Sequence, residues 1–87
     1  MPFIQDEWPD PSGRTPLVAQ IRDFQVVIGA FSQRTPDSFG ASCELPAFLD
    51  GHTDDARHVR ALIHEHLGED VLQRVEVRAR MWLQRYG

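Results

Sequence analysis

The sequence predicts an α+β fold of the order β-β-α-β. In it an antiparallel hairpin and a C-terminal strand form a small sheet, and one helix packs on one face. Three observations lead to this prediction. Residues 38–45 alternate between apolar and polar side chains, as the two faces of a strand require. Residues 50–68 carry helix start and stop signals around an apolar stripe. Residues 74–83 alternate again, with three arginines on the polar side.

Residues 1–16 are predicted to be a proline-rich N-terminal arm, followed by a single α+β domain over residues 17–87. Four of the six prolines of the chain lie in this arm, and proline neither donates to a β-ladder nor continues a helix. The arm also carries Phe3, Ile4 and Trp8. We expect these apolar side chains to dock across the core or across a neighbouring subunit.

The next segment, residues 17–31, fits two patterns. Its large apolar residues have helical spacing: Leu17, Ile21, Phe24, Ile28 and Phe31. Three consecutive β-branched residues, followed by Gly29, favour a sheet instead, because both residue types are unfavourable inside a helix. We therefore predict a strand over 24–31 and a lead-in strand over 17–22, with a bend near Asp23.

Residues 38–45 form the clearest predicted strand. Their apolar residues fall on one face: Phe39, Ala41, Cys43 and Leu45. The connection from the preceding strand, residues 32–37, is rich in turn-forming residues. The two strands are therefore predicted to pair as an antiparallel hairpin that ends before Pro46.

The predicted helix at 50–68 has recognisable ends. Thr53 is a suitable N-cap, two aspartates follow it at the positive end of the helix dipole, and Gly68 is a natural stop. The apolar stripe consists of Ala56, Val59, Leu62, Ile63, and His66 or Leu67.

The segment 74–83 decides between two folds. As a strand it places Val75, Val77, Ala79, Met81 and Leu83 on one face, and Arg74, Glu76, Arg78, Arg80 and Trp82 on the other. As a helix it would have a stripe of Leu72, Val75, Ala79, Trp82 and Tyr86, but Val77 and Met81 would face water. Alternation accounts for more residues, so we predict a strand. The alternative is a three-helix bundle over 16–31, 53–67 and 70–86.

The composition of the chain disfavours several classes of protein. The net charge of −4 disfavours a dedicated nucleic-acid binder, and a single cysteine excludes an intramolecular disulfide. No stretch approaches the roughly 20 apolar residues of a membrane span, and the N-terminus lacks a signal-peptide pattern, so we expect a cytoplasmic protein. All nine basic residues are arginine, which indicates a GC-rich, bacterial genome.

The candidate binding residues gather near the C-terminus. They are Arg74, Arg78, Arg80, Trp82, Arg85 and Tyr86. Arginine, tryptophan and tyrosine are enriched at the energetic centres of protein interfaces, and arginine also binds anionic groups. The alternative interpretation is a solvated sheet face with charge pairs between strands.

No cofactor or metal is expected. Histidines that share a metal on a helix lie three or four residues apart. His58 and His64 are six residues apart, and His64 and His66 are two apart. Cys43 is predicted to be a small core residue.

The N-terminal stretch Met1-Pro2-Phe3-Ile4-Gln5, followed by Gly13-Arg14, resembles the tautomerase family. Those enzymes use an N-terminal proline, exposed when methionine is removed, as a base. The resemblance covers the first 14 residues and implies that Pro2 is the base and Arg14 binds a substrate carboxylate. The chain departs from the family pattern at residues 6–11, where two prolines interrupt the expected strand.

Taken together, the sequence favours a small non-enzymatic binding, regulatory or accessory module that acts through protein–protein contacts, and a homo-oligomer. One alternative is a small oligomeric enzyme whose active site lies at a subunit interface and uses Pro2 or a histidine. The other is a nucleic-acid binder that uses the arginine face.

Overall fold

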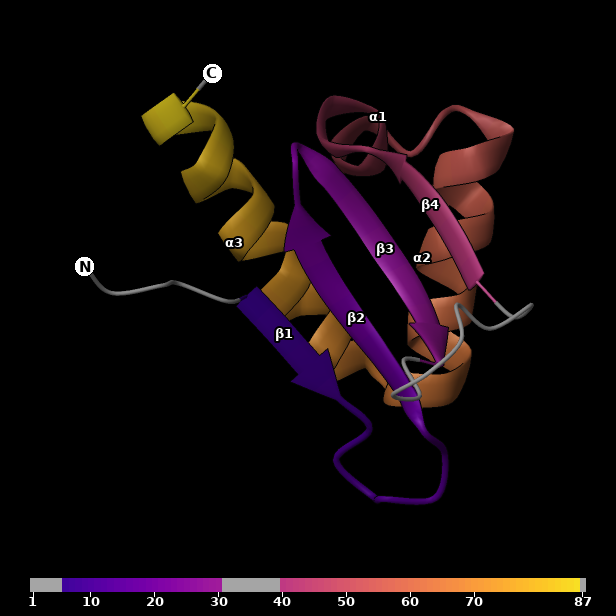
Figure 1. Ribbon diagram of the computed structural model, residues 1–87. Coiled ribbons are helices and arrows are strands. Elements are labelled where there is room, and N and C mark those ends of the chain that lie inside the picture. Colours follow the sequence, from indigo (N-terminus) through magenta and orange to yellow (C-terminus); the bar gives the residue numbers. More distant parts are fainter. Residues whose placement is uncertain (1–5, 31–39, 87) are drawn as a thin grey trace.

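The computed structural model describes residues 6–30 and 40–86 and has the predicted α+β class. Four strands precede three helices, so the order differs from β-β-α-β. Figure 1 shows the sheet in front and the helices together behind one of its faces. The elements are β1 Asp6–Pro9, β2 Leu17–Arg22, β3 Gln25–Ala30, β4 Gly40–Glu44, α1 Leu45–Asp50, α2 Asp54–Leu67 and α3 Glu69–Tyr86.

The sheet is an antiparallel meander in the order β1-β2-β3-β4. The predicted pairing of β3 with β4 is confirmed, from Gln25 opposite Glu44 to Gly29 opposite Gly40. The predicted lead-in strand is β2, but it turns back to pair with β3 instead of bending into it. Phe31, Phe39 and the predicted loop over 32–37 lie outside the described residues.

The edge strand β1 lies in the segment that the sequence assigns to the N-terminal arm. It pairs antiparallel with β2, from Asp6 opposite Ile21 to Pro9 opposite Val18. Trp8 is partly buried and packs against the core. Residues 1–5 lie outside the described residues, and the division of the chain at residue 16 stays a prediction.

The core fills the space between the sheet and the helices. Alternate sheet residues point into it, as do one side of α2 and one side of α3. Its largest fully buried side chains are Phe48, Ile28, Leu45, Ile63, Val26, Val59 and Val75. The predicted ends of α2 are confirmed, since the N–H of Ala56 donates to Thr53 Oγ1 at 3.1 Å. Gly68, at φ 98°, is the single residue that joins α2 to α3.

The prediction of a strand over 74–83 is wrong, because this segment lies inside the 18-residue helix α3. The buried residues of α3 recur at every fourth position, at Val71, Val75 and Ala79. Val75 and Ala79 fit both patterns, but Val77 and Met81 are 54 % and 48 % exposed, as only a helix requires. Most residues of α3 are strong helix formers, and this propensity prevails over the alternation. The three-helix bundle is also wrong, because residues 17–30 form β2 and β3.

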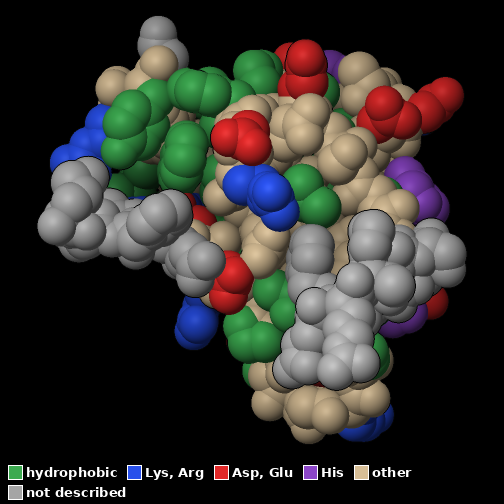
Figure 2. All heavy atoms as spheres, viewed as in Figure 1, with side chains coloured by type: hydrophobic (Ala, Val, Ile, Leu, Met, Phe, Trp, Pro, Cys, Tyr) green, Lys and Arg blue, Asp and Glu red, His purple; other side chains and the backbone are tan. Residues whose placement is uncertain are grey.

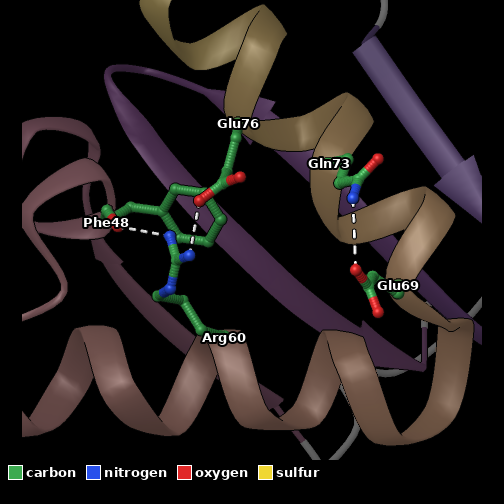
Figure 3. A network of polar contacts seen from close by, with 5 residues as sticks. All are labelled: Phe48, Arg60, Glu69, Gln73 and Glu76. Carbon is green, nitrogen blue, oxygen red and sulfur yellow. Dashed lines mark hydrogen bonds and ion pairs between the residues drawn. The ribbon is translucent and has the colours of Figure 1, made fainter.

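A half-buried arginine links the three helices (Figure 3). Arg60 of α2 donates through Nη1 to the carbonyl oxygen of Phe48 at 2.9 Å and forms an ion pair through Nη2 with Glu76 of α3. Its guanidinium lies 5.0 Å from the centroid of the Phe48 ring. The guanidinium therefore makes three contacts at once, two through separate nitrogens and one with the aromatic ring.

The turn between β1 and β2 is organised by the Asp10 carboxylate. Oδ1 accepts from the backbone N–H of Ser12 at 2.9 Å and from its hydroxyl at 2.8 Å. Oδ2 accepts from the N–H of Thr15 at 3.0 Å and from its hydroxyl at 3.2 Å. These hydrogen bonds, those from Ser12 above all, lower the pKa of Asp10 to about 2.

We predict that this turn keeps its hydrogen bonds until the pH falls to about 2. The folded-state pKa lies below the usual value of about 4 for an unfolded aspartate, so the stabilisation is complete above pH 4 and is lost as the pH falls through about 2. An NMR titration should show that the amide shifts of Ser12 and Thr15 change with a midpoint near pH 2. A midpoint near pH 4 would contradict the hydrogen-bonded geometry.

Cys43 occupies the buried position that the sequence predicts, at 5 % exposure. Burial raises the pKa of its thiol from about 9 to about 11. The thiolate is the reactive form, so at pH 7.5 the native protein should react with iodoacetamide at least about 100-fold more slowly than the unfolded chain. Equal alkylation rates with and without denaturant would show that the thiol is accessible.

Candidate functional site

A buried carboxylate fastens the edge strand to the last helix. Asp6 lies on β1 with its side chain toward the helices and only 7 % exposed. Its Oδ1 accepts from Nε of Arg78 at 2.8 Å, and its Oδ2 accepts from Nε1 of Trp82. The two donors lie on the same side of α3 because they are four residues apart. They satisfy a charge that would otherwise be unfavourable in this buried position.

An open groove of about 700 Å³ lies between β1 and α3, beside this carboxylate. Among the described strands β1 has only β2 as a neighbour, so one edge of β1 is unpaired there. An unpaired strand edge is a common place for another chain to bind. The groove is lined by Asp6, Glu7 and Trp8 of β1 and by Asp70, Gln73, Arg74, Val77 and Arg78 of α3.

Apolar side chains continue from the groove along α3. Val77 and Met81 are about half exposed and lie one turn apart. Tyr86, in the last turn, is 55 % exposed, but it lies about 140° around the helix from Met81 and belongs to a second apolar patch with Trp82. In Figure 2 hydrophobic side chains gather over the C-terminal end of this helix. This surface has the character of a contact site and not of a fully solvated helix.

Phe24, in the turn between β2 and β3, belongs to the aromatic cluster with Trp82 and Tyr86. Its ring lies edge-on to Trp82 and Tyr86, with centroid distances of 5.8 and 6.5 Å, and is partly exposed. Its φ of 60° is rare for a bulky residue. The backbone N–H of Leu45 donates to its carbonyl oxygen at 2.8 Å, which helps to hold the turn in this conformation.

The residues predicted to bind a partner all lie on α3, which separates them into groups. Arg74 and Arg78 line the groove, whereas Trp82 and Tyr86 belong to the aromatic cluster with Phe24. Arg80 and Arg85 are exposed. At 3.6 residues per turn, Arg80 lies about 120° around the helix from Arg74, whereas Arg85 lies within about 20° of it.

The arginines also differ in their contacts. Arg78 is engaged by Asp6, whereas Arg74, Arg80 and Arg85 have no hydrogen bond or ion pair to any described residue. Arg74 and Arg85 therefore remain available on one side of the helix. Their role in binding stays a prediction.

Sequence reasoning missed the contribution of β1 and of the exposed apolar residues. Asp6 and Trp8 are two residues apart, as inward-facing strand residues are, but the surrounding prolines obscured that signal. Val77 and Met81 were counted against a helix, although an apolar pair at i, i+4 away from the buried stripe is itself a signal for a contact surface.

The described residues give less support to a metal site, to a histidine-based site and to the tautomerase-like site of Pro2 and Arg14. In residues 6–30 and 40–86 no group of three or more histidine, cysteine, aspartate or glutamate side chains could hold a metal ion. His52, His58 and His64 are exposed. Arg14 is exposed and its Nε donates to Ser12 Oγ at 3.2 Å, while Pro2 lies outside the described residues. None of the described helices is long and apolar enough to cross a membrane.

No model of a known protein family, no curated protein and no solved structure matches this chain.

Replacing Asp6 should destabilise the protein. In Asp6→Ala, Trp82 Nε1 loses its acceptor and Arg78 loses its counter-ion, so we expect the free energy of unfolding to fall by about 1–3 kcal/mol. Urea denaturation measures this change. Glu7→Gln is the matched control on the exposed side of the same strand and should stay within about 0.5 kcal/mol of wild type. Equal stability of Asp6→Ala and Glu7→Gln would show that the buried contact contributes nothing.

Proposed function

We propose that this protein is a non-enzymatic binding module that acts through protein–protein contacts made by the outward side of α3 and the groove beside β1. The observation that carries the proposal is the exposure of Val77 and Met81 next to a groove bordered by an edge of β1 that pairs with none of the described strands. An extended apolar surface with arginine and aromatic residues around it is typical of protein interfaces.

The charges of the groove favour a protein partner over a nucleic acid. Three carboxylates and two arginines line it, and one of these arginines already pairs with Asp6. A nucleic-acid site would need an excess of basic residues along the phosphate backbone. A mixed set of charges instead suits a protein surface that carries both signs.

The aromatic cluster is a second, rigid apolar patch at the C-terminal end of α3. Trp82 is fixed by its hydrogen bond to Asp6, and the ring of Tyr86 lies 5.0 Å from it. Rings that are held in place before binding lose little conformational entropy when a partner docks.

Affinity capture with three baits tests the proposal. We expect wild type to retain a partner from native lysate, and Arg74→Glu to recover at least about tenfold less of it, as loss of an interface hot spot does. Arg80→Glu should recover as much as wild type, because it makes the same charge change about 120° around α3 from Arg74, at a position that does not line the groove. Mass spectrometry identifies the partner, including the untagged chain itself.

All baits are first checked for native circular dichroism. Arg78→Glu is not a suitable bait, because it would place a second carboxylate beside buried Asp6. Equal recovery by the Arg74→Glu and Arg80→Glu baits would exclude the groove side of α3 as the contact surface.

A further inference from the structure

One side of α3 carries a charge pattern that is complementary to itself. The pattern runs Asp70, Arg74, Val77, Met81, Arg85, all within about 80° of arc on a helix of 3.6 residues per turn. We call these five residues the α3 stripe. An acidic residue lies in the first turn, an arginine lies in the last turn, and the two exposed apolar residues lie between them.

Two stripes match only when they run antiparallel. With a two-fold axis near Val77, Asp70 of each copy lies opposite Arg85 of the other, and the aliphatic stem of each Arg74 lies against the Met81 of the other. In a parallel pair each charged residue of the stripe would face the same residue of the other copy, and the like charges would repel each other. In the antiparallel arrangement the two helix dipoles also oppose each other, so the positive end of each helix lies beside the negative end of the other.

The groove beside the stripe provides room for such a neighbour. Asp70, Arg74 and Val77 belong both to the stripe and to the groove wall, and the opposite wall is β1. Side chains of a second α3 helix would enter this space and cover the exposed apolar area. The contact is small by the standard of permanent dimers, so the dissociation constant is expected to be in the micromolar range.

We infer that the partner at the proposed contact surface is a second copy of this chain, bound through antiparallel packing of the two α3 stripes. The inference rests on the proposed function, since it identifies the occupant of the same surface. It also accounts for the exposure of Val77 and Met81, which a second copy would bury. The dimer is symmetric, so each charged pair occurs twice.

Paired charge reversal tests the geometry. Asp70→Arg alone places arginine opposite Arg85 at both ends of the interface, and Arg85→Asp alone places carboxylate opposite Asp70 at both ends. Sedimentation velocity at low ionic strength, over about 1 µM to about 1 mM, should show a wild-type dimer and at least about tenfold weaker self-association of each variant.

A one-to-one mixture of the two variants should associate again. In the mixed dimer each end joins an arginine to an aspartate, so the dissociation constant should return to within about threefold of wild type. Recovery in the mixture cannot arise from misfolding of either variant. Arg80→Glu, which lies off the stripe, is the matched control and should dimerise as wild type does.

The outcomes separate the inference from the proposed function. A wild-type chain that stays monomeric at 1 mM, or variants that fail to associate in the mixture, would overturn the inference. If a different protein were still captured in an Arg74-dependent way, the proposed function would stand without it. A dimer with the expected charge dependence would support both, because the contact is itself made by the outward side of α3.

Discussion

The contact between Asp6 and the donors Arg78 and Trp82 is the constraint on which the binding surface depends. The described part of β1 has four residues, ends at a proline and has β2 as its one partner among the described strands. Such a strand is weak by itself. The buried carboxylate adds directional bonds from α3 to its first residue. These bonds fix the distance between strand and helix, and that distance is the width of the groove.

The other side of α3 is held as firmly. Arg60 joins α2 to Glu76 and to the last turn of α1, while Gly68 leaves one residue between the two long helices. The helix is therefore supported by its neighbours on the flank away from the groove. A surface presented on a rigid element keeps its residues in register with one another, as a specific contact requires.

The sequence predicted the α+β class, the β3–β4 hairpin and the bounds of α2, because these rest on local signals such as strict alternation, an N-cap and a terminal glycine. It did not predict that Glu69–Tyr86 form one helix. Val75 and Ala79 satisfy both a two-residue and a four-residue period, so the pattern alone was ambiguous. The burial that decides between them comes from packing against the sheet, which no local window contains.

Part of the candidate site could also be predicted from the sequence. Arg74, Arg78 and Trp82 were selected by residue type, which holds whatever element carries them. Their grouping was not, because a helix separates Arg80 from Arg74 whereas a strand would have aligned them. Asp6 could not have been chosen, since its importance comes from donors more than 70 residues further along the chain.

The long separation in sequence between Asp6 and its donors Arg78 and Trp82 affects the order in which the chain folds. β1 is synthesised before the other described elements, but the donors that fix Asp6 belong to α3 and leave the ribosome more than 70 residues later. The meander of β2, β3 and β4 and the helix α2 have mostly nearer partners and can form earlier. β1 can pair with β2 across the short turn of residues 10–16 before α3 is made, so the long-range step is the docking of α3 on Asp6. Until α3 docks, only the backbone ladder to β2 holds β1 in the sheet, and the carboxylate of Asp6 has neither of its α3 donors.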